Sequence, residues 1–214
     1  MACRERDARV LPPPDPDSVF LNIPYDEEFH DLYVAYIVGL SCLGLVPHLA
    51  SERPGGKRRL DRILEIIQSC RYSIHDLSRV EVSTAYPATP RFNMPLELGM
   101  TIAWEHLKPE THTWFVFESE RFRLQKSASD LNGTDPNIHD GTAEGVLREL
   151  CNAFVRDSAP SVREMLDVYG TVHDFLRFSL EKYRTRSPFD RSVFEELRYF
   201  STNLAVASGV RHKP

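Results

Sequence analysis

Short apolar runs alternate with longer amphipathic segments along the first two thirds of the chain. Four runs rich in β-branched and aromatic residues predict strands, because each ends at polar or proline positions. They cover residues 18–24, 45–51, 71–78 and 112–119. Pro47 in the second run favours an edge strand or a bulge, since proline cannot donate a hydrogen bond to a sheet.

The segments between these runs repeat apolar residues at helical spacing. The residues Leu60, Ile63, Leu64 and Ile67, for example, share one face of a predicted helix. Helices are expected at 25–44, 57–70, 93–107 and 142–155, followed by two more at about 161–183 and 188–207. A strand near Asn137–His139 is left open, so the count is four or five.

Alternating strands and helices predict a parallel sheet with helices on both faces and right-handed crossovers. The expected fold class is therefore α/β, a flavodoxin-like doubly wound parallel sheet of four or five strands with a C-terminal helical extension. Residues 1–17 form a polar, proline-stiffened lead-in without the apolar core of a signal peptide, residues 18–157 the α/β domain, and residues 158–214 the extension.

An apolar stripe that includes Met165, Val172 and Leu176 marks the first helix of this extension. It is too apolar for an exposed surface. It either packs on the core of the domain or supports self-association, and the sequence leaves both alternatives open.

Composition narrows the class of protein. Apolar residues make up 42% of the chain and aromatics 10%, enough for a core, and the formal charge of −5 gives no long-range attraction to nucleic acid or to an anionic membrane. No stretch approaches the roughly 20 apolar residues of a membrane span. The four cysteines are too far apart for CxxC ligand pairs, so no metal site and unpaired, reduced thiols in a cytoplasmic protein are expected.

Ligands of open parallel sheets bind at the carboxyl ends of the strands. The polar residues that the sequence places there are Asn22, Pro24, Tyr25 and Asp26, then Ser51 to Lys57, then His75, Asp76 and Ser78, then Arg91, Asn93 and Glu97 in the loop and helix after the third strand, and finally Glu118, Ser119, Arg121 and Arg123 after the fourth strand. The PGGK turn at 54–57 lacks the GxxxxGK[ST] spacing of a P-loop, which argues against nucleoside triphosphate hydrolysis.

Glu97 is the candidate catalytic group. It lies in the expected first turn of the helix at 93–107, where the helix dipole favours the ionised form. A carboxylate at this edge can stabilise or trap an oxocarbenium-like sugar. The alternative is a structural role, with Met94 as N-cap and Glu97 at the capping-box position.

The other candidates carry alternatives as well. Asp76 could act in the site or accept hydrogen bonds from nearby backbone amides. His75 alternates with Asp76 along the strand, so the two side chains should point to opposite faces, and a packed histidine is expected. Arg91 could bind phosphate or brace the long loop, and Tyr25 could stack on a base or pack in the core.

Three segments, VFLNIPYDEEF, IHDLS and FNMPLELGM, resemble the superfamily that joins nucleoside 2-deoxyribosyltransferases to TIR and TIR-like domains. The resemblance covers roughly residues 18–155. Glu97-Leu98-Gly99 matches the glutamate motif that supplies the nucleophile of the transferases, and Asp76 matches the aspartate at the end of the preceding strand. This chain has RFNMP where the transferases usually have D-x-G-T.

The resemblance implies cleavage of the N-glycosidic bond of NAD or a related nucleotide, a TIR-like activity found in bacterial anti-phage defence. Glu97 would be the nucleophile or charge stabiliser, and Asp76 would bind ribose hydroxyls or orient Glu97. The residues that would bind substrate are Asn22, Pro24, Tyr25, Ser78, Arg91 and Asn93, with Arg91 on phosphate. The nucleotide would be substrate, with no further cofactor, and the chain would form homo-oligomers. The alternative is a non-catalytic nucleotide-sensing module or a TIR-type assembly module.

Overall fold

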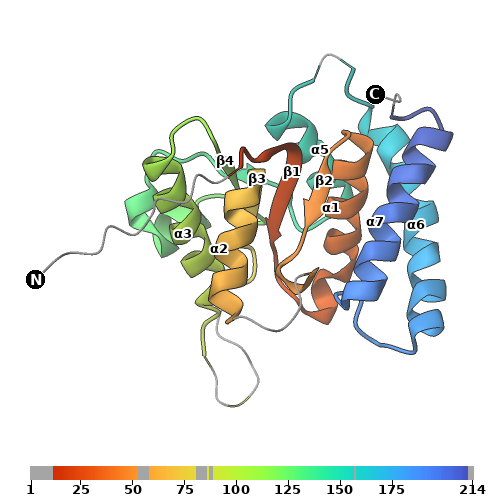
Figure 1. Ribbon diagram of the computed structural model, residues 1–214, viewed down its shortest axis with the longest axis horizontal. Coiled ribbons are helices and arrows are strands. Elements are labelled where there is room, and N and C mark those ends of the chain that lie inside the picture. Colours follow the sequence, from red (N-terminus) through yellow and green to blue (C-terminus); the bar gives the residue numbers. More distant parts are fainter. Residues whose placement is uncertain (1–11, 53–57, 81–85, 87–88, 157, 212–214) are drawn as a thin grey trace, which may run out of the picture.

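The computed structural model describes residues 12–52, 58–80, 86, 89–156 and 158–211. Most of the expected lead-in and the PGGK turn therefore lie outside the described residues. Five parallel strands form one sheet in the order β2-β1-β3-β4-β5. This confirms the predicted doubly wound, flavodoxin-like α/β fold (Figure 1).

The strands follow the apolar runs of the sequence. They are β1 (Asp15–Asn22), β2 (Val46–His48), β3 (Cys70–Asp76), β4 (Thr113–Glu118) and β5 (Asn137–Ile138). The strand that contains Pro47 lies at the edge of the sheet, as predicted. β1 begins at Asp15, inside the expected lead-in, because Asp15 pairs with Cys70 at the start of β3.

The helices also match the periodicity. They are α1 (His30–Cys42), α2 (Arg59–Ser69), α3 (Asn93–Leu107), α5 (Ala143–Ala153), α6 (Val162–Tyr183) and α7 (Arg191–Ala207), with a short α4 (Arg123–Ser127) and the 3-10 turns η1 (Glu27–Phe29), η2 (Ala50–Glu52) and η3 (Ser129–Leu131). The bounds of α3 are those expected from the sequence.

The two faces of the sheet carry separate cores. Phe20 and Cys70 pack against Ile63 and Ile67 of α2 on one face. On the opposite face α1 and α5 cover the sheet, and α6 and α7 form a further layer outside α1 (Figure 1). The alternation of side chains along each strand therefore decides which helices a residue can reach.

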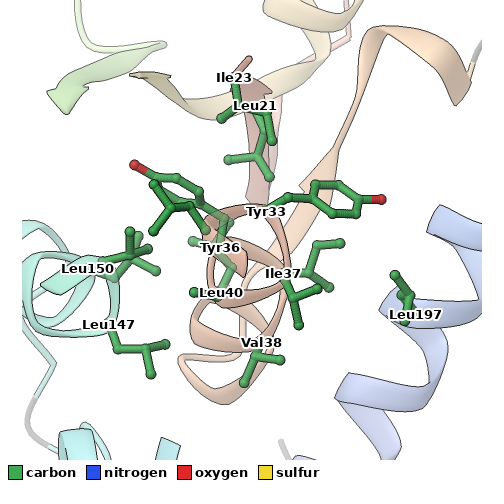
Figure 2. Packing of buried hydrophobic residues seen from close by; sticks show 14 of the residues in the cluster. Leu21, Ile23, Tyr33, Tyr36, Ile37, Val38, Leu40, Leu147, Leu150 and Leu197 are labelled. Atoms are coloured by element: carbon green, nitrogen blue, oxygen red, sulfur yellow. The ribbon is translucent and has the colours of Figure 1, made fainter. Parts of the chain in front are cut away.

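α1 lies at the centre of the larger core. Every residue from Leu32 to Cys42 is buried, because the sheet, α5, α6 and α7 surround this helix. Its side chains point outward in several directions, toward Leu147 and Leu150 of α5 on one side and Leu197 of α7 on the other (Figure 2).

The apolar stripe of α6 is part of this same core. Met165, Val168, Val172 and Leu176 are buried in one cluster with α1. The packing alternative for the stripe is therefore confirmed, and the C-terminal helices complete the fold rather than trailing from it. Self-association stays a prediction.

Two further observations bear on the class of protein. No helix in the described part of the chain is long and apolar enough to cross a membrane. Cys42, Cys70 and Cys151 form no disulfide in the described part of the chain, and Cys3 lies outside it.

Candidate functional site

A cavity of about 450 Å³ opens at the carboxyl end of β1, between the first residues of α2 and of α3. Its lining consists of Leu21, Asn22, Ile23, Pro24, Tyr25, Ala50, Arg59, Arg91, Asn93, Met94 and Glu97. Six of the eight residues proposed from the sequence therefore share one cavity, at the sheet edge where the fold predicts a ligand. The other two, Asp76 and Ser78, are not among its lining residues.

Glu97 lies on the floor of this cavity, with only 4% of the residue exposed. Its carboxyl group has no hydrogen-bond or ion-pair partner within the described residues. Thr101 Oγ1 donates to the Glu97 backbone carbonyl and leaves the side chain untouched. An unpartnered carboxyl group facing a cavity is available to a ligand.

The structural alternative for Glu97, with Met94 as N-cap and Glu97 at the capping-box position, is wrong. Phe92 occupies the N-cap position and Asn93 is the first helical residue, so Glu97 lies in the second turn. Because the effect of the helix dipole falls off within the first turn, it cannot hold Glu97 ionised as predicted.

Burial decides the protonation of Glu97 instead. It raises the pKa of the carboxyl group from 4.5 to about 7, against an opposing effect of the Arg59 charge. Both the protonated and the ionised forms are therefore populated near neutral pH, which is the range that suits an acid, a base or a nucleophile.

Asn22 is held beside Glu97 by two hydrogen bonds. Its Nδ2 donates to the Met94 carbonyl at 2.9 Å and to His75 Nδ1, also at 2.9 Å. The amide thereby ties the end of β1 to the first turn of α3, the helix whose second turn carries Glu97. Since the Asn22 nitrogen can only donate, His75 Nδ1 must be the unprotonated nitrogen of a neutral ring.

The hydrogen bonds continue behind His75 in one consistent direction. His75 Nε2 donates to Ser73 Oγ at 3.0 Å, Ser73 Oγ donates to His112 Nε2 at 2.9 Å, and His112 Nδ1 donates to the Cys70 carbonyl at 2.9 Å. Burial lowers the pKa of His75 to about 3 and also lowers that of His112, so both rings are neutral. The packed histidine predicted from the sequence is confirmed.

Asp76 points to the opposite face of the sheet. It is fully buried, and it accepts hydrogen bonds from Tyr36 Oη at 2.7 Å and from the Ser78 backbone nitrogen at 2.9 Å. His139 Nε2 lies 3.2 Å from Asp76 Oδ2. Burial raises the pKa of Asp76, but the contact with His139 and the hydrogen bonds from Ser78 and Tyr36 bring it below the usual value.

The structure therefore does not bring Asp76 or Ser78 to Glu97. Asn22 and His75 pair across β1 and β3 and face α3, whereas the next residue along β3 turns toward α1. The geometry corrects the expectation that Asp76 binds ribose hydroxyls or orients Glu97, and gives Asp76 a place in a buried network with Tyr36.

Arg91 lines the cavity but its charge is engaged. Asp26 binds Arg91 and also Arg79, the latter at 3.2 Å. The bracing role is therefore the one that this geometry supports. Arg59, by contrast, is exposed at the cavity mouth and forms no ion pair within the described residues. The sequence did not single it out, because it begins an amphipathic helix in a mixed run of charges.

Tyr25 at the rim stacks on Phe189, with ring centroids 4.8 Å apart and an interplanar angle of 13°. Phe189 lies in the turn between α6 and α7, where Tyr33 Oη also donates to the Pro188 carbonyl at 2.9 Å. Tyr25 thus has the packing role that the sequence left open, and the C-terminal helices reach the cavity through a contact that no local pattern signals.

Comparison of the chain with models of protein families, with curated proteins and with solved structures found no match. The site consequently rests on its own geometry, which is a buried carboxyl group of near-neutral pKa, an amide held by its neighbours and a cation at the mouth of the cavity.

Proposed function

We propose that this protein cleaves the N-glycosidic bond of NAD or a related nucleotide, with Glu97 facing the anomeric carbon. One observation carries the proposal. A single carboxyl group, 4% exposed and without a partner in the described part of the chain, lies on the floor of a cavity at the ligand-binding edge of the sheet.

The chemistry needs little beyond this group. Cleavage at the anomeric carbon passes through an oxocarbenium-like state, which an ionised carboxylate stabilises or captures covalently. Nicotinamide leaves as a neutral molecule from a cationic ring, so its departure needs no proton donor. One ionised Glu97 can therefore suffice, without the participation of Asp76.

A second cavity favours a substrate of two parts. It measures about 460 Å³, lies on the other side of the start of α3 and is lined mostly by apolar residues such as Leu77, Pro95 and Ile102. Arg91 lines both cavities. A ligand with two ring systems joined by phosphates, such as a dinucleotide, suits this arrangement better than a simple nucleoside does.

Incubation of the full chain with NAD, followed by measurement of nicotinamide release, tests the proposal. Glu97→Gln should abolish release, whereas Glu105→Gln, the same change on the same helix outside the cavity lining, should not. Because the ionised form acts, the rate should rise with pH around 7. Wild-type release equal to that of Glu97→Gln would remove the enzymatic role.

A nucleotide-sensing function is the second candidate, and the stack of Tyr25 on Phe189 favours it. This stack joins the cavity rim to the turn between α6 and α7, so occupancy could be relayed to the C-terminal helices. Retention of an intact nucleotide after incubation, detected by mass spectrometry, would favour sensing, and release of the base would favour cleavage.

A further inference from the structure

The polar groups of the cavity differ between its floor and its rim. Asn22 and Glu97 on the floor are 3% and 4% exposed. The cations Arg59 and Arg91 lie nearer the mouth, and the former is exposed. A ligand that fills this cavity therefore meets buried oxygen atoms at one end and positive charge at the other.

The amide of Asn22 has a fixed orientation. Its two N–H groups are both used, one by the Met94 carbonyl and one by His75 Nδ1. A rotated amide would set its oxygen against that carbonyl and against an unprotonated ring nitrogen, which are both acceptors. The chain through Ser73 to His112 prevents His75 from relieving this conflict by a simple change of tautomer.

This orientation leaves Asn22 Oδ1 as the free end of the amide. It has no partner within the described residues, and Asn22 lines the cavity. A carbonyl oxygen can only accept a hydrogen bond. A buried acceptor that stays unsatisfied costs free energy, so the floor discriminates against ligands that present an acceptor or an apolar group there.

The rim of the cavity favours a ligand that carries negative charge. Arg91 is compensated by Asp26, whereas Arg59 has no carboxylate ion-pair partner within the described residues. The Arg59 charge lowers the pKa of Glu97 on the floor, although burial outweighs this effect. An incoming anion consequently finds its strongest uncompensated attraction at Arg59.

We infer that Asn22 is a specificity-determining residue that accepts a hydrogen bond from a sugar hydroxyl, while Arg59 binds the phosphate of the same ligand, a phosphorylated ribose. The inference rests on the proposed function for the choice of ribose, and it assigns the phosphate contact to Arg59 in place of Arg91.

Binding of three probes to the full chain by titration calorimetry tests both ends. Ribose 5-phosphate should bind at least about tenfold more tightly than ribose or inorganic phosphate, since it engages floor and rim together. Arg59→Gln should reduce its affinity to near that of ribose. Arg58→Gln is the matched control, because Arg58 pairs with Asp61 and does not line the cavity.

Three results would overturn the inference. Equal affinity for inorganic phosphate and ribose 5-phosphate would leave the floor without a role, and equal effects of the Arg59 and Arg58 substitutions would remove the rim contact. Failure of the wild-type chain to bind ribose 5-phosphate would count against the floor contact and the rim contact alike.

The role of Asn22 is best observed in the wild-type chain, because substitutions there break the tie to α3 and risk unfolding. NMR of asparagine-labelled protein should find both Asn22 side-chain protons protected from exchange, and ribose 5-phosphate should shift the Cγ resonance while this protection persists. Side-chain protons that exchange freely, or an unshifted Cγ at saturation, would contradict the fixed acceptor.

Failure of this inference and failure of the proposed function give different results. Binding of ribose 5-phosphate without cleavage of NAD would leave the recognition of phosphorylated ribose standing and remove the catalysis. Cleavage of NAD that Arg59→Gln leaves unchanged, without binding of ribose 5-phosphate, would leave the catalysis standing and remove the recognition of phosphorylated ribose.

Discussion

Replacement of Glu97 by glutamine should stabilise the fold at high pH, although it removes the group proposed to act. In the unfolded chain this carboxyl group loses its proton near pH 4.5, but burial delays that loss in the folded state to about pH 7. Between these values the folded state binds more protons, so wild-type stability falls as the pH rises through this window.

The magnitude follows from the two pKa values. A shift from 4.5 to about 7 corresponds to ~3 kcal/mol of unfolding free energy, present below the lower value and fully lost above the upper one. Glutamine has nearly the same shape and cannot ionise. Glu97→Gln should therefore gain up to ~3 kcal/mol over wild type at pH 8 relative to their difference at pH 4.5.

Urea unfolding at pH 4.5, 6 and 8 measures this difference, with Glu105→Gln as the control on the same helix. A buried amide without hydrogen-bond partners carries its own penalty, but that penalty is the same at every pH and only offsets the curve. A difference between Glu97→Gln and wild type that does not change with pH would refute the claim that burial raises the pKa of Glu97.

Three other changes test the surroundings of the site. Arg59→Gln should raise the pKa of Glu97 above its value of about 7, seen as an upward shift of the carboxyl titration by carbon-13 NMR, because the opposing charge is lost. Phe189→Ala should cost about 3 kcal/mol in urea unfolding, since the ring is almost fully buried, and unchanged stability would argue against its packing role. Gly145→Ala should destabilise the fold by about 1–3 kcal/mol in the same assay, the usual cost of overpacking, because the new Cβ would lie 1.9 Å from the His139 carbonyl oxygen; unchanged stability there would contradict the close approach.

The sequence predicted the layers of the fold because each element bears a local signature. The periodicity of residues 93–107 gave the bounds of α3, and Pro47 marked an edge strand. The start of β1 was missed because Asp15 and Asp17 are polar, and only pairing with β3 makes them part of the sheet. Pairing is a long-range property that a local pattern does not contain.

The prediction of the site was correct where it depended on local pattern and wrong where long-range packing decides the position of a side chain. Polar residues after strands reach the carboxyl edge in any parallel sheet, which placed Asn22 and Glu97 correctly. The face on which Asp76 lies depends on the register of β3 against β1, and the contact of Phe189 with Tyr25 depends on the folding back of α6 and α7. Neither can be derived from spacing along the chain.

The energetics of Glu97 argue for a role beyond structure. Its burial costs ~3 kcal/mol at pH 8, within a total stability that is typically about 5–15 kcal/mol for a folded domain. No described residue offers the carboxyl group a hydrogen bond that would compensate. Leucine or methionine on the cavity floor would avoid the penalty altogether. A fold that keeps an unpartnered acid there, beside an amide with its acceptor free, is organised for a ligand rather than for its own stability.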